Sequence, residues 1–588
     1  MIELLVKYAR SQGISLPPGF APKTVKWALS FDVAGVYLGV LPLGDTSIKK
    51  NPGQTFPCCP DLTQGELVSL KGGAHFLVET AQVVALHGDE KPDLSNPKHR
   101  FFIQTLCQSA KVISGLDGVA KTLEDAAVLQ TIAKDLAELK AKPTDKVTIR
   151  MNGIYPVETD VWHAWWQHFR DVLRDKTRDK SSASGGAKMV SYASGELDTP
   201  ALTHPKIIGL SDVGGIGMGS PLIGFDKDAF PSYGLPQSAN AAMSEETAST
   251  YRAALNHLIA NHGQRLAGAK VVHWFSHKVE PENDPFAWIE EPQAQTELDA
   301  LHRAKAILNA IRDGTKADLA DNHYYALTLS GAGGRVMVRD WMEGQFAELV
   351  DCVNHWFSDL AIAHRDGRGL APNPKFLAVM GATNRDLGDV SAPAIARMWR
   401  VAAHGYSIPS QFMAMALARA RVDIIQGNPA NHARMGLLRA YHVRQGDKYM
   451  EPYLNEQHPE AAYHCGRLMS VLADLQSAAL PNVDAGVVQR YYAAASSTPA
   501  LVLGRLTRTS QYHLNKIGGG LAHIYEDRIA TIWGSLRDNV PATLSLEQQS
   551  LFALGYYQQM AKDRADRAER AAQKKQQTIH DEKENSNA

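Results

Sequence analysis

The chain has 588 residues, of which 44% are hydrophobic and 21% charged, and its formal net charge is −1 at pH 7. This length predicts roughly three or four domains, and the near-neutral charge argues against a protein that coats naked duplex DNA unaided. The N-terminal segment lacks the apolar core of a signal peptide and no later apolar run is long enough to cross a bilayer, so we expect a cytoplasmic protein with no membrane partner. The five cysteines lack zinc-site spacing, and we expect reduced thiols and no cofactor.

The first part of the chain mixes helices and strands. An amphipathic run over residues 1–13 predicts a helix, and residues 26–43 read as two alternating strands joined at a turn. Helical patterns cover residues 97–141, a strand is expected at 146–154, and a helix rich in tryptophan follows near residues 162–166. This order indicates an α+β beginning.

Composition changes at residues 175–188, which are charged and then rich in Ser and Gly, as in a flexible linker. Beyond it, glycines and short apolar runs indicate strands and ordered loops, with one helix at residues 244–262. Residues 324–341 read as strand, glycine turn and strand. Residues 342–361 form an amphipathic helical pattern, and every later element is expected to be helical.

The C-terminal part has the pattern of a helical bundle. Apolar residues from Ala461 to Ala479 recur at alternating intervals of four and three, while Ser545 with Gln548 predicts a capping box. The fold class is therefore α+β, a mixed α/β N-terminal portion with hairpins and inserted helices, followed by an all-α C-terminal helical bundle. The expected segments are an N-terminal α+β region (1–174), a linker (175–188), a β-rich region (189–341), an arginine-rich helical region (342–449), the bundle (450–573) and a disordered tail (574–588).

Two stretches of the helical part are rich in basic residues and poor in acids. The first, residues 394–446, has only Asp423 as an acid and contains Arg397, Arg400, Arg419, Arg421, Arg434, Arg439 and Arg444. The second, residues 485–525, has no Asp or Glu and contains Arg490, Arg505, Arg508 and Lys516. Guanidinium groups without neighbouring carboxylates suit a phosphate backbone, so we expect nucleic-acid contacts here. The alternative is a pair of solvated helix faces whose acidic partners come from elsewhere in the fold.

Two glycine runs are candidates for binding loops. The run at residues 214–219 lacks the GK[ST] of a phosphate-binding loop and no clear helix begins there, so we assign it no cofactor. The run at 331–334 lies between two expected strands and predicts a turn that presents Arg335 and Arg339 from one face of the second strand.

The enzyme alternative is a metal-dependent nuclease or hydrolase that uses His355, Asp359, His364 and Asp366. However, His355 and Asp359 also lie on the polar face of an amphipathic helix, which favours a solvated surface. The sequence contains no GxSxG, HExxH or P-loop motif. We therefore expect no catalytic site and no metal.

Five segments in order resemble the large subunit of type I-C CRISPR Cascade. They are HPKIIGL (204–210), SYGLPQSANAAMSEETASTYRAALNHLI (232–259), YYALTLSGAGGRVMVRDW (324–341), AYHCGRLMSVLADLQ (462–476) and SLEQQSLFALGYYQQ (545–559). The similarity covers nearly the whole chain.

The resemblance implies a non-catalytic subunit of a crRNA-guided complex that recognises the protospacer-adjacent motif in double-stranded target DNA, helps to open the duplex and stabilises the R-loop. The implied partners are crRNA, the backbone and guide-handle-binding subunits of Cascade, and a helicase-nuclease. It also implies a small subunit made from an internal start in the same gene, for which Met450 and Met469 are the candidates. A third reading is a helical scaffold that only bridges protein subunits.

Within this resemblance, the loop containing Lys71, Gly72, Gly73 and His75 is the expected motif reader. Gln237 and Asn240 are the expected duplex wedge, because an inserted side chain can unstack a base step. The plainer alternatives are that Lys71 is an ordinary surface lysine and that Gln237 and Asn240 hydrogen-bond their own loop.

Overall fold

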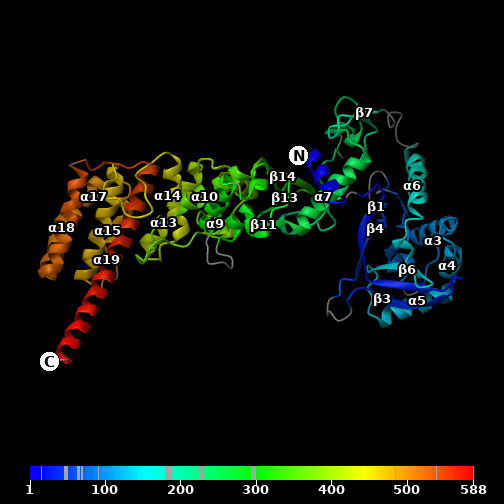
Figure 1. Ribbon diagram of the computed structural model, residues 1–588, viewed down its shortest axis with the longest axis horizontal. Helices are drawn as coiled ribbons and strands as arrows, with labels where there is room; N and C mark the ends of the chain where they lie inside the picture. Colours follow the sequence, from blue (N-terminus) through cyan, green and yellow to red (C-terminus); the bar gives the residue numbers. More distant parts are fainter. Residues whose placement is uncertain are drawn as a thin grey trace. The chain divides into compact units, whose positions relative to one another are not determined.

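The computed structural model divides the chain into two compact units (Figure 1). Unit 1 comprises Met1–Asn261 and Gly331–Met337, and unit 2 comprises His262–Ser330 and Val338–Ala588. The structure describes all residues except 15, 46–50, 63–66, 68–69, 90–91, 179–187, 226, 228, 293–299, 314, 482, 484, 538 and 587–588.

Unit 1 contains a four-stranded sheet in the order β3-β2-β6-β5. The predicted hairpin is formed by β2 (Trp27–Phe31) and β3 (Tyr37–Pro42), which pair antiparallel. The later strand β6 (Lys146–Met151) pairs parallel to β2, and β5 (Val78–Thr80) pairs antiparallel to β6. A separate antiparallel pair joins β1 (Phe20–Val25) to β4 (Gln54–Pro60).

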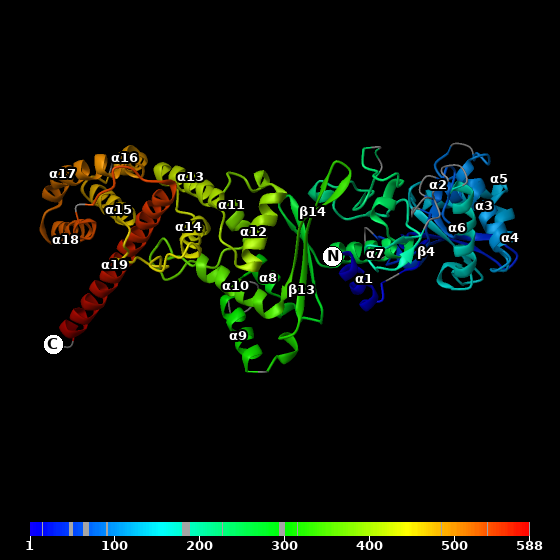
Figure 2. The same cartoon turned by 90° about the horizontal axis from the view of Figure 1, so that it is seen from above.

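Helices, strands and loops all contribute to the apolar core of unit 1. Figure 2 shows α3, α4 and α5 gathered with α6. Trp162 and Trp166, from the predicted tryptophan-rich segment, have no exposed surface, and the ring of Phe76 stacks on Trp166 with 5.8 Å between centroids. The helices are α1 (Ile2–Ser11), α2 (Ala81–Val84), α3 (Pro97–Ser109), α4 (Leu116–Leu123), α5 (Ala126–Glu138), α6 (His163–Arg178) and α7 (Glu245–Asn261).

The predicted β-rich region divides between the two units. In unit 1 its strands have only two residues each: β7 (Met189–Val190), β8 (Leu197–Asp198), β9 (Lys206–Ile207) and β10 (Ser220–Pro221). Its longer strands form a sheet in the order β11-β12-β13-β14. Their bounds are β11 (Gly263–Leu266), β12 (Ala269–Phe275), β13 (His323–Ala332) and β14 (Arg335–Gln345), and Gly331–Met337 at the β13–β14 turn belong to unit 1.

The amphipathic helix expected from residue 342 begins later than predicted. Strand β14 continues to Gln345, and α10 (Phe346–Leu360) starts where the Phe346 N–H donates to the carbonyl of Asn322 at 2.8 Å. Within the added residues Gly344 lies against the ring of Tyr324 of β13, where a Cβ atom would come within 2.9 Å of the ring.

After β14 the described residues form helices and no further strand, as the sequence predicts. One hydrophobic cluster runs through unit 2 from the sheet to the last helix, and Met450 is buried in it. The helices of unit 2 other than α10 are α8 (Pro285–Glu290), α9 (Ala300–Arg312), α11 (Phe376–Gly381), α12 (Ala392–His404), α13 (Ser410–Gln426), α14 (His432–Arg444), α15 (Ala461–Ala479), α16 (Val487–Ala495), α17 (Pro499–Ile517), α18 (Gly519–Leu536) and α19 (Leu546–Ser586).

The C-terminal bundle packs around α15, which contacts α16, α17, α18 and α19. The predicted capping box is present, since Ser545 N donates to Gln548 Oε1 at 3.1 Å and Gln548 N to Ser545 Oγ at 3.2 Å. Helix α19 runs through Lys574, where the tail was expected to begin, to Ser586. The α+β fold class, with a mixed first part and a helical C-terminal part, is confirmed.

Candidate nucleic-acid interface

The first arginine-rich stretch contains arginines that meet carboxylates from distant parts of unit 2. Arg400 on α12 donates from Nε to Asp340 Oδ2 at 2.8 Å, and this pairing raises the pKa of Arg400. Arg434 is buried and forms an ion pair with Asp423. The expectation that Asp423 is the one acid near this stretch is therefore wrong, because packing also brings Asp340 to Arg400.

Arg439 and Arg444 on α14 are also internal. Arg444 donates from Nε to Asp359 Oδ2 at 2.8 Å. Arg439 is 7% exposed and donates from Nη1 to the carbonyls of Ser358 and Asp359 at 2.7 and 2.8 Å. Burial lowers the pKa of Arg439 to about 10, so it stays charged at neutral pH. These two arginines bind α10 to α14 and do not form an open phosphate-binding surface.

The remaining arginines of this stretch differ in accessibility. Arg419 is half-buried with Nη2 3.8 Å from Asp423 Oδ1, and Arg421 donates to the carbonyl of Ala493 at 3.0 Å. Arg397 is exposed on α12 and forms no ion pair with any residue that the structure describes. Among the seven arginines of the first stretch, Arg397 alone is both exposed and unpaired within the described chain.

The two arginines expected at the glycine turn are engaged within their own units. Arg335, in unit 1, lies over the ring of Phe230 with 4.4 Å between its guanidinium carbon and the ring centroid. Arg339, in unit 2, donates from Nε to Ser330 Oγ at 2.7 Å. The contacts hold both side chains in fixed directions.

The second basic stretch is different because its cations are exposed. Arg490 lies on α16, and Arg505, Arg508 and Lys516 lie on α17, whose sequence contains no Asp or Glu. Within the described chain none of these four side chains forms an ion pair. Helix α17 has no acid of its own, so a carboxylate could reach its cations only from another element.

Spacing places these cations in one stripe. Arg505, Arg508, Tyr512 and Lys516 are separated by three, four and four residues, so a helix with 3.6 residues per turn presents them on one side. Tyr512 is 77% exposed. We call these four side chains the α17 face. The acid-poor sequence indicated the cations but not Tyr512, which its spacing from Arg508 and Lys516 could have indicated.

The two glycine runs pack against each other by their backbones. A Cβ atom on Gly331 would lie 2.1 Å from the backbone nitrogen of Gly215. Gly333 and Gly334 have φ of +55° and +83°, as the turn between β13 and β14 requires. Close backbone packing at Gly215 and Gly331 and the turn at Gly333 and Gly334 thus give these glycines a structural explanation in unit 1.

The expected motif-reading loop is only partly accessible. Lys71 is exposed, and Gly72 has φ of +74°. The Nδ1 atom of His75 accepts a hydrogen bond from the Leu62 N–H at 3.1 Å, while the His75 N–H donates to Glu79 Oε2 at 2.8 Å. Burial is the main cause that lowers the pKa of His75 to about 4, so the imidazole is neutral near pH 7. Lys71 alone offers an exposed cation here.

The expected wedge loop is held by Asn240. Its Nδ2 donates to the carbonyls of Leu235 and Gln237, both at 2.8 Å, and its Oδ1 accepts from the Ser232 N–H at 2.8 Å. Gln237 is exposed and has φ of +43°. The contacts give Asn240 a role in shaping the loop and leave the Gln237 side chain available to a partner.

The candidate metal ligands do not converge. His355 Nδ1 lies 3.3 Å from Asp351 Oδ2, while Asp359 receives Arg444. The ring of His364 faces His432 with 4.5 Å between centroids. No group of three or more His, Cys, Asp or Glu able to hold a metal ion occurs among the residues that the structure describes.

Comparison with known proteins bears on the whole chain. The family model for CRISPR-associated protein (Cas_Csd1) matches residues 4–563. The chain belongs to the Cas_Csd1 family. No curated protein sequence matches it.

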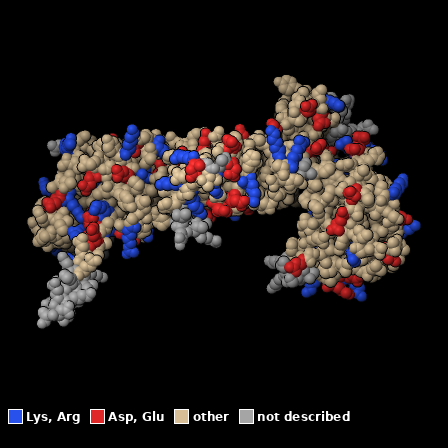
Figure 3. All heavy atoms as spheres, viewed as in Figure 1, with Lys and Arg blue, Asp and Glu red and all other residues tan. Residues whose placement is uncertain are grey.

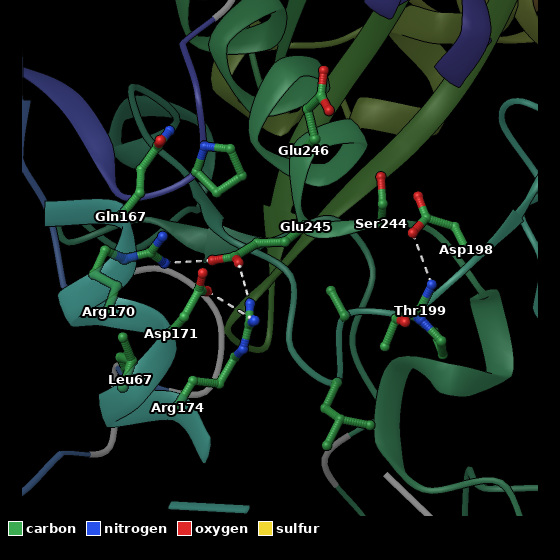
Figure 4. Close-up of a pocket in the computed structure, with 14 residues that line it drawn as sticks. Leu67, Gln167, Arg170, Asp171, Arg174, Asp198, Thr199, Ser244, Glu245 and Glu246 are labelled. Atoms are coloured by element: carbon green, nitrogen blue, oxygen red, sulfur yellow. Dashed lines mark hydrogen bonds and ion pairs between the residues drawn. The ribbon is translucent and has the colours of Figure 1, made fainter. Parts of the chain in front are cut away.

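This Cas_Csd1 chain also has a charged pocket in unit 1, with a volume of about 460 Å³. Figure 4 shows Arg170 and Arg174 of α6 pointing toward Glu245 at the start of α7, with Nη–Oε distances of 2.5 and 3.2 Å. Arg174 Nη2 also lies 2.9 Å from Asp171. Because Asp198 and Glu246 line the pocket too, acids outnumber the two arginines and the pocket does not suit a phosphate.

The wider surface of this Cas_Csd1 chain carries charges of both signs. Figure 3 shows basic and acidic side chains interspersed over the face drawn. None of the described helices is long and apolar enough to span a membrane. A nucleic-acid interface should therefore be local, and the α17 face contains a local group of exposed cations that form no ion pair within the described residues.

Proposed function

We propose that this chain is the non-catalytic large subunit of a crRNA-guided DNA-targeting complex of the type I-C Cascade kind. Membership in the Cas_Csd1 family supports a place in a CRISPR complex. The ordered resemblance of five segments supports the large-subunit assignment. The observation that carries the nucleic-acid role is the α17 face, where three unpaired cations share one side of a helix without acids.

In this proposal, Lys71 and Gln237 contact the target duplex. Both side chains are exposed, and each lies beside a loop whose backbone is held by internal hydrogen bonds. Lys71 recognises the protospacer-adjacent motif, and Gln237 helps to separate the strands. His75 and Asn240 position these loops, because their polar atoms are already engaged. Guide pairing supplies most sequence discrimination, so few protein contacts to bases are needed.

The proposed partners are crRNA, double-stranded target DNA, the backbone and guide-handle-binding subunits and a helicase-nuclease. A separate small subunit from the same gene would begin at Met450 or Met469. A chain starting at Met469 would lose the first part of α15, including Gly466, which contacts α19. Met450 precedes α15 and keeps this packing intact, so it is the favoured start. Peptide mapping of the N-terminus of any C-terminal fragment decides between them.

The proposed absence of catalysis is supported by the contacts of two candidate catalytic groups. Asp359 accepts from Arg444, and His364 packs on His432. These contacts support a structural use of the side chains that the nuclease alternative requires. Metal titration of the full chain and a nuclease assay with added Mg²⁺ or Mn²⁺ test that alternative directly.

The decisive experiment measures target binding against salt concentration in the complex reconstituted with crRNA. The variant R505A/R508A/K516A should lower affinity and reduce the magnitude of the slope of log K against log salt by about 2 to 3, if each cation meets one phosphate. The control K7A/K134A/K278A removes three exposed lysines that each lie near a carboxylate, Glu3, Glu138 and Glu280 respectively. Equal slopes for the α17 variant and the unmodified complex would refute this interface.

A further inference from the structure

Tyr512 is an exposed aromatic side chain at the centre of a cationic stripe. It lies four residues from both Arg508 and Lys516, and 77% of its surface is accessible. No hydrogen bond, ion pair or ring contact joins its side chain to the part of the chain that the structure describes. Single exposed apolar residues are common, so the inference rests on the combination of the ring with unpaired cations.

Other tyrosines of unit 2 show what a structural role looks like. Tyr525 is 4% exposed and donates to Asp474 Oδ2 at 2.8 Å, and Tyr557 is 1% exposed and donates to the carbonyl of Ala363 at 2.6 Å. Their rings fill the core while their hydroxyls are satisfied. Tyr512 has neither feature, and its ring faces remain available to a partner.

We infer that the α17 face binds single-stranded nucleic acid, with an unpaired base stacked on Tyr512 and the backbone held by Arg505, Arg508 and Lys516. The inference rests on the proposed function, because it names the class of nucleic acid that the same face takes. In a duplex the faces of the bases are covered by their neighbours, so an aromatic ring on a protein surface finds none to stack on. Unpaired bases expose these faces, and aromatic rings beside basic residues are the usual means of holding single strands.

The dimensions of the stripe agree with a strand that lies along the helix. Arg505 and Lys516 are eleven residues apart on α17, which corresponds to about 16 Å along the axis at 1.5 Å per residue. One strand of B-form DNA places about five phosphates over that length, and a more extended strand places fewer. Several cations can therefore meet one strand while Tyr512 reaches a base between them.

Leu501 extends the same side of α17 by one further step. It lies four residues before Arg505 and is also 77% exposed. An exposed leucine beside the stripe offers apolar contact to a base or sugar and nothing to a hydrated duplex backbone. It is therefore consistent with a ligand whose bases are unpaired.

The test compares binding of a fluorescein-labelled single-stranded oligodeoxynucleotide with binding of the corresponding duplex to the full-length chain. Y512A should weaken single-strand binding by about 5- to 150-fold, the range for loss of one stacked base, and leave duplex binding and the salt slope nearly unchanged. Y512F should retain single-strand binding, because stacking needs the ring and not the hydroxyl. Y192A is the matched control, since Tyr192 is 78% exposed in unit 1.

The results of these measurements can refute stacking on Tyr512 without refuting the cationic interface. If R505A/R508A/K516A weakens binding but Y512A does not, or if Y512A weakens both nucleic acids equally, the stacking assignment is wrong and the cationic interface stands. If neither variant changes binding, both are wrong. Photocrosslinking of a 5-bromodeoxyuridine oligonucleotide should place the adduct on Tyr512, and an adduct on other residues alone would overturn the inference even if the affinities agreed.

Discussion

Asp359 on α10 accepts a hydrogen bond from Arg444 on α14 at 2.8 Å, although 85 residues separate them. Their side chains are 13% and 6% exposed. Through Nη1, Arg444 also donates to the carbonyls of Val401 and Tyr406 at 2.9 and 2.7 Å. A single guanidinium group thus joins α10, α14 and the C-terminal end of α12.

Because Arg444 is engaged inside unit 2, its loss should lower the stability of the fold and leave DNA binding unchanged. R444M should lower the free energy of unfolding of unit 2 by about 3 kcal/mol, because the Asp359 carboxylate would stay largely buried without its partner. Urea unfolding monitored by intrinsic fluorescence measures the change. R397M is the control, since Arg397 is exposed on α12 and should cost little. A salt slope of DNA binding that changed in R444M but not in R397M would show that Arg444 does meet nucleic acid.

The features predicted correctly from the sequence are those that depend on residues close together in the chain. The β2–β3 hairpin, the helix at α7 and the capping reciprocity of Ser545 and Gln548 each depend on a few consecutive residues. The pairing of β6 parallel to β2 depends on residues more than a hundred positions apart, and the pattern of either strand does not specify it. The first residue of α10 was missed for a related reason, since the Phe346 N–H donates to the carbonyl of Asn322, a residue that is distant in the sequence.

The same distinction between local and long-range causes explains which contacts of the candidate site could be predicted. Arg400 and Arg444 looked unpaired because only acids near them in sequence were considered, whereas Asp340 and Asp359 reach them through packing. The unpaired state of the α17 cations was easier to predict, because a helix with no acid in its own sequence can form ion pairs only with acids of other elements. The engagement of His75 with Leu62 and Glu79 could not be predicted, since it depends on how two loops fold together.

Gly466 and Gly555 permit a close crossing of α15 and α19. A Cβ atom on Gly466 would lie 1.9 Å from the carbonyl oxygen of Phe552, and one on Gly555 would lie 2.0 Å from that of Tyr463. G466A should therefore force the helices apart and destabilise unit 2 by about 2 kcal/mol or more. Thermal unfolding by circular dichroism measures the loss.

Gly504 provides the matched control for that substitution. It lies within α17, and a Cβ atom there would meet nothing within 4 Å. G504A should stabilise the chain by about 0.5–1 kcal/mol, because alanine loses less backbone entropy on forming a helix. Similar effects of the two substitutions would mean that close approach of α15 and α19 does not explain Gly466.

The buried imidazole of His75 should make the stability of unit 1 depend on pH. Its pKa falls from 6.5 to about 4, first because of burial and then because the Lys23 cation is close. As the pH decreases from 6.5 toward 4, the unfolded chain binds a proton that the folded chain does not, so the stability of unit 1 should fall by at most about 3 kcal/mol through this group. H75Q should reduce that fall, because glutamine can accept from the Leu62 N–H and does not titrate. His204, whose pKa is also lowered to about 4 by burial, contributes with the same sign, so the slopes of the parent and H75Q must be compared over the same window. Equal slopes, or a His75 imidazole that titrates near 6.5 by NMR, would contradict the buried and neutral state of this side chain.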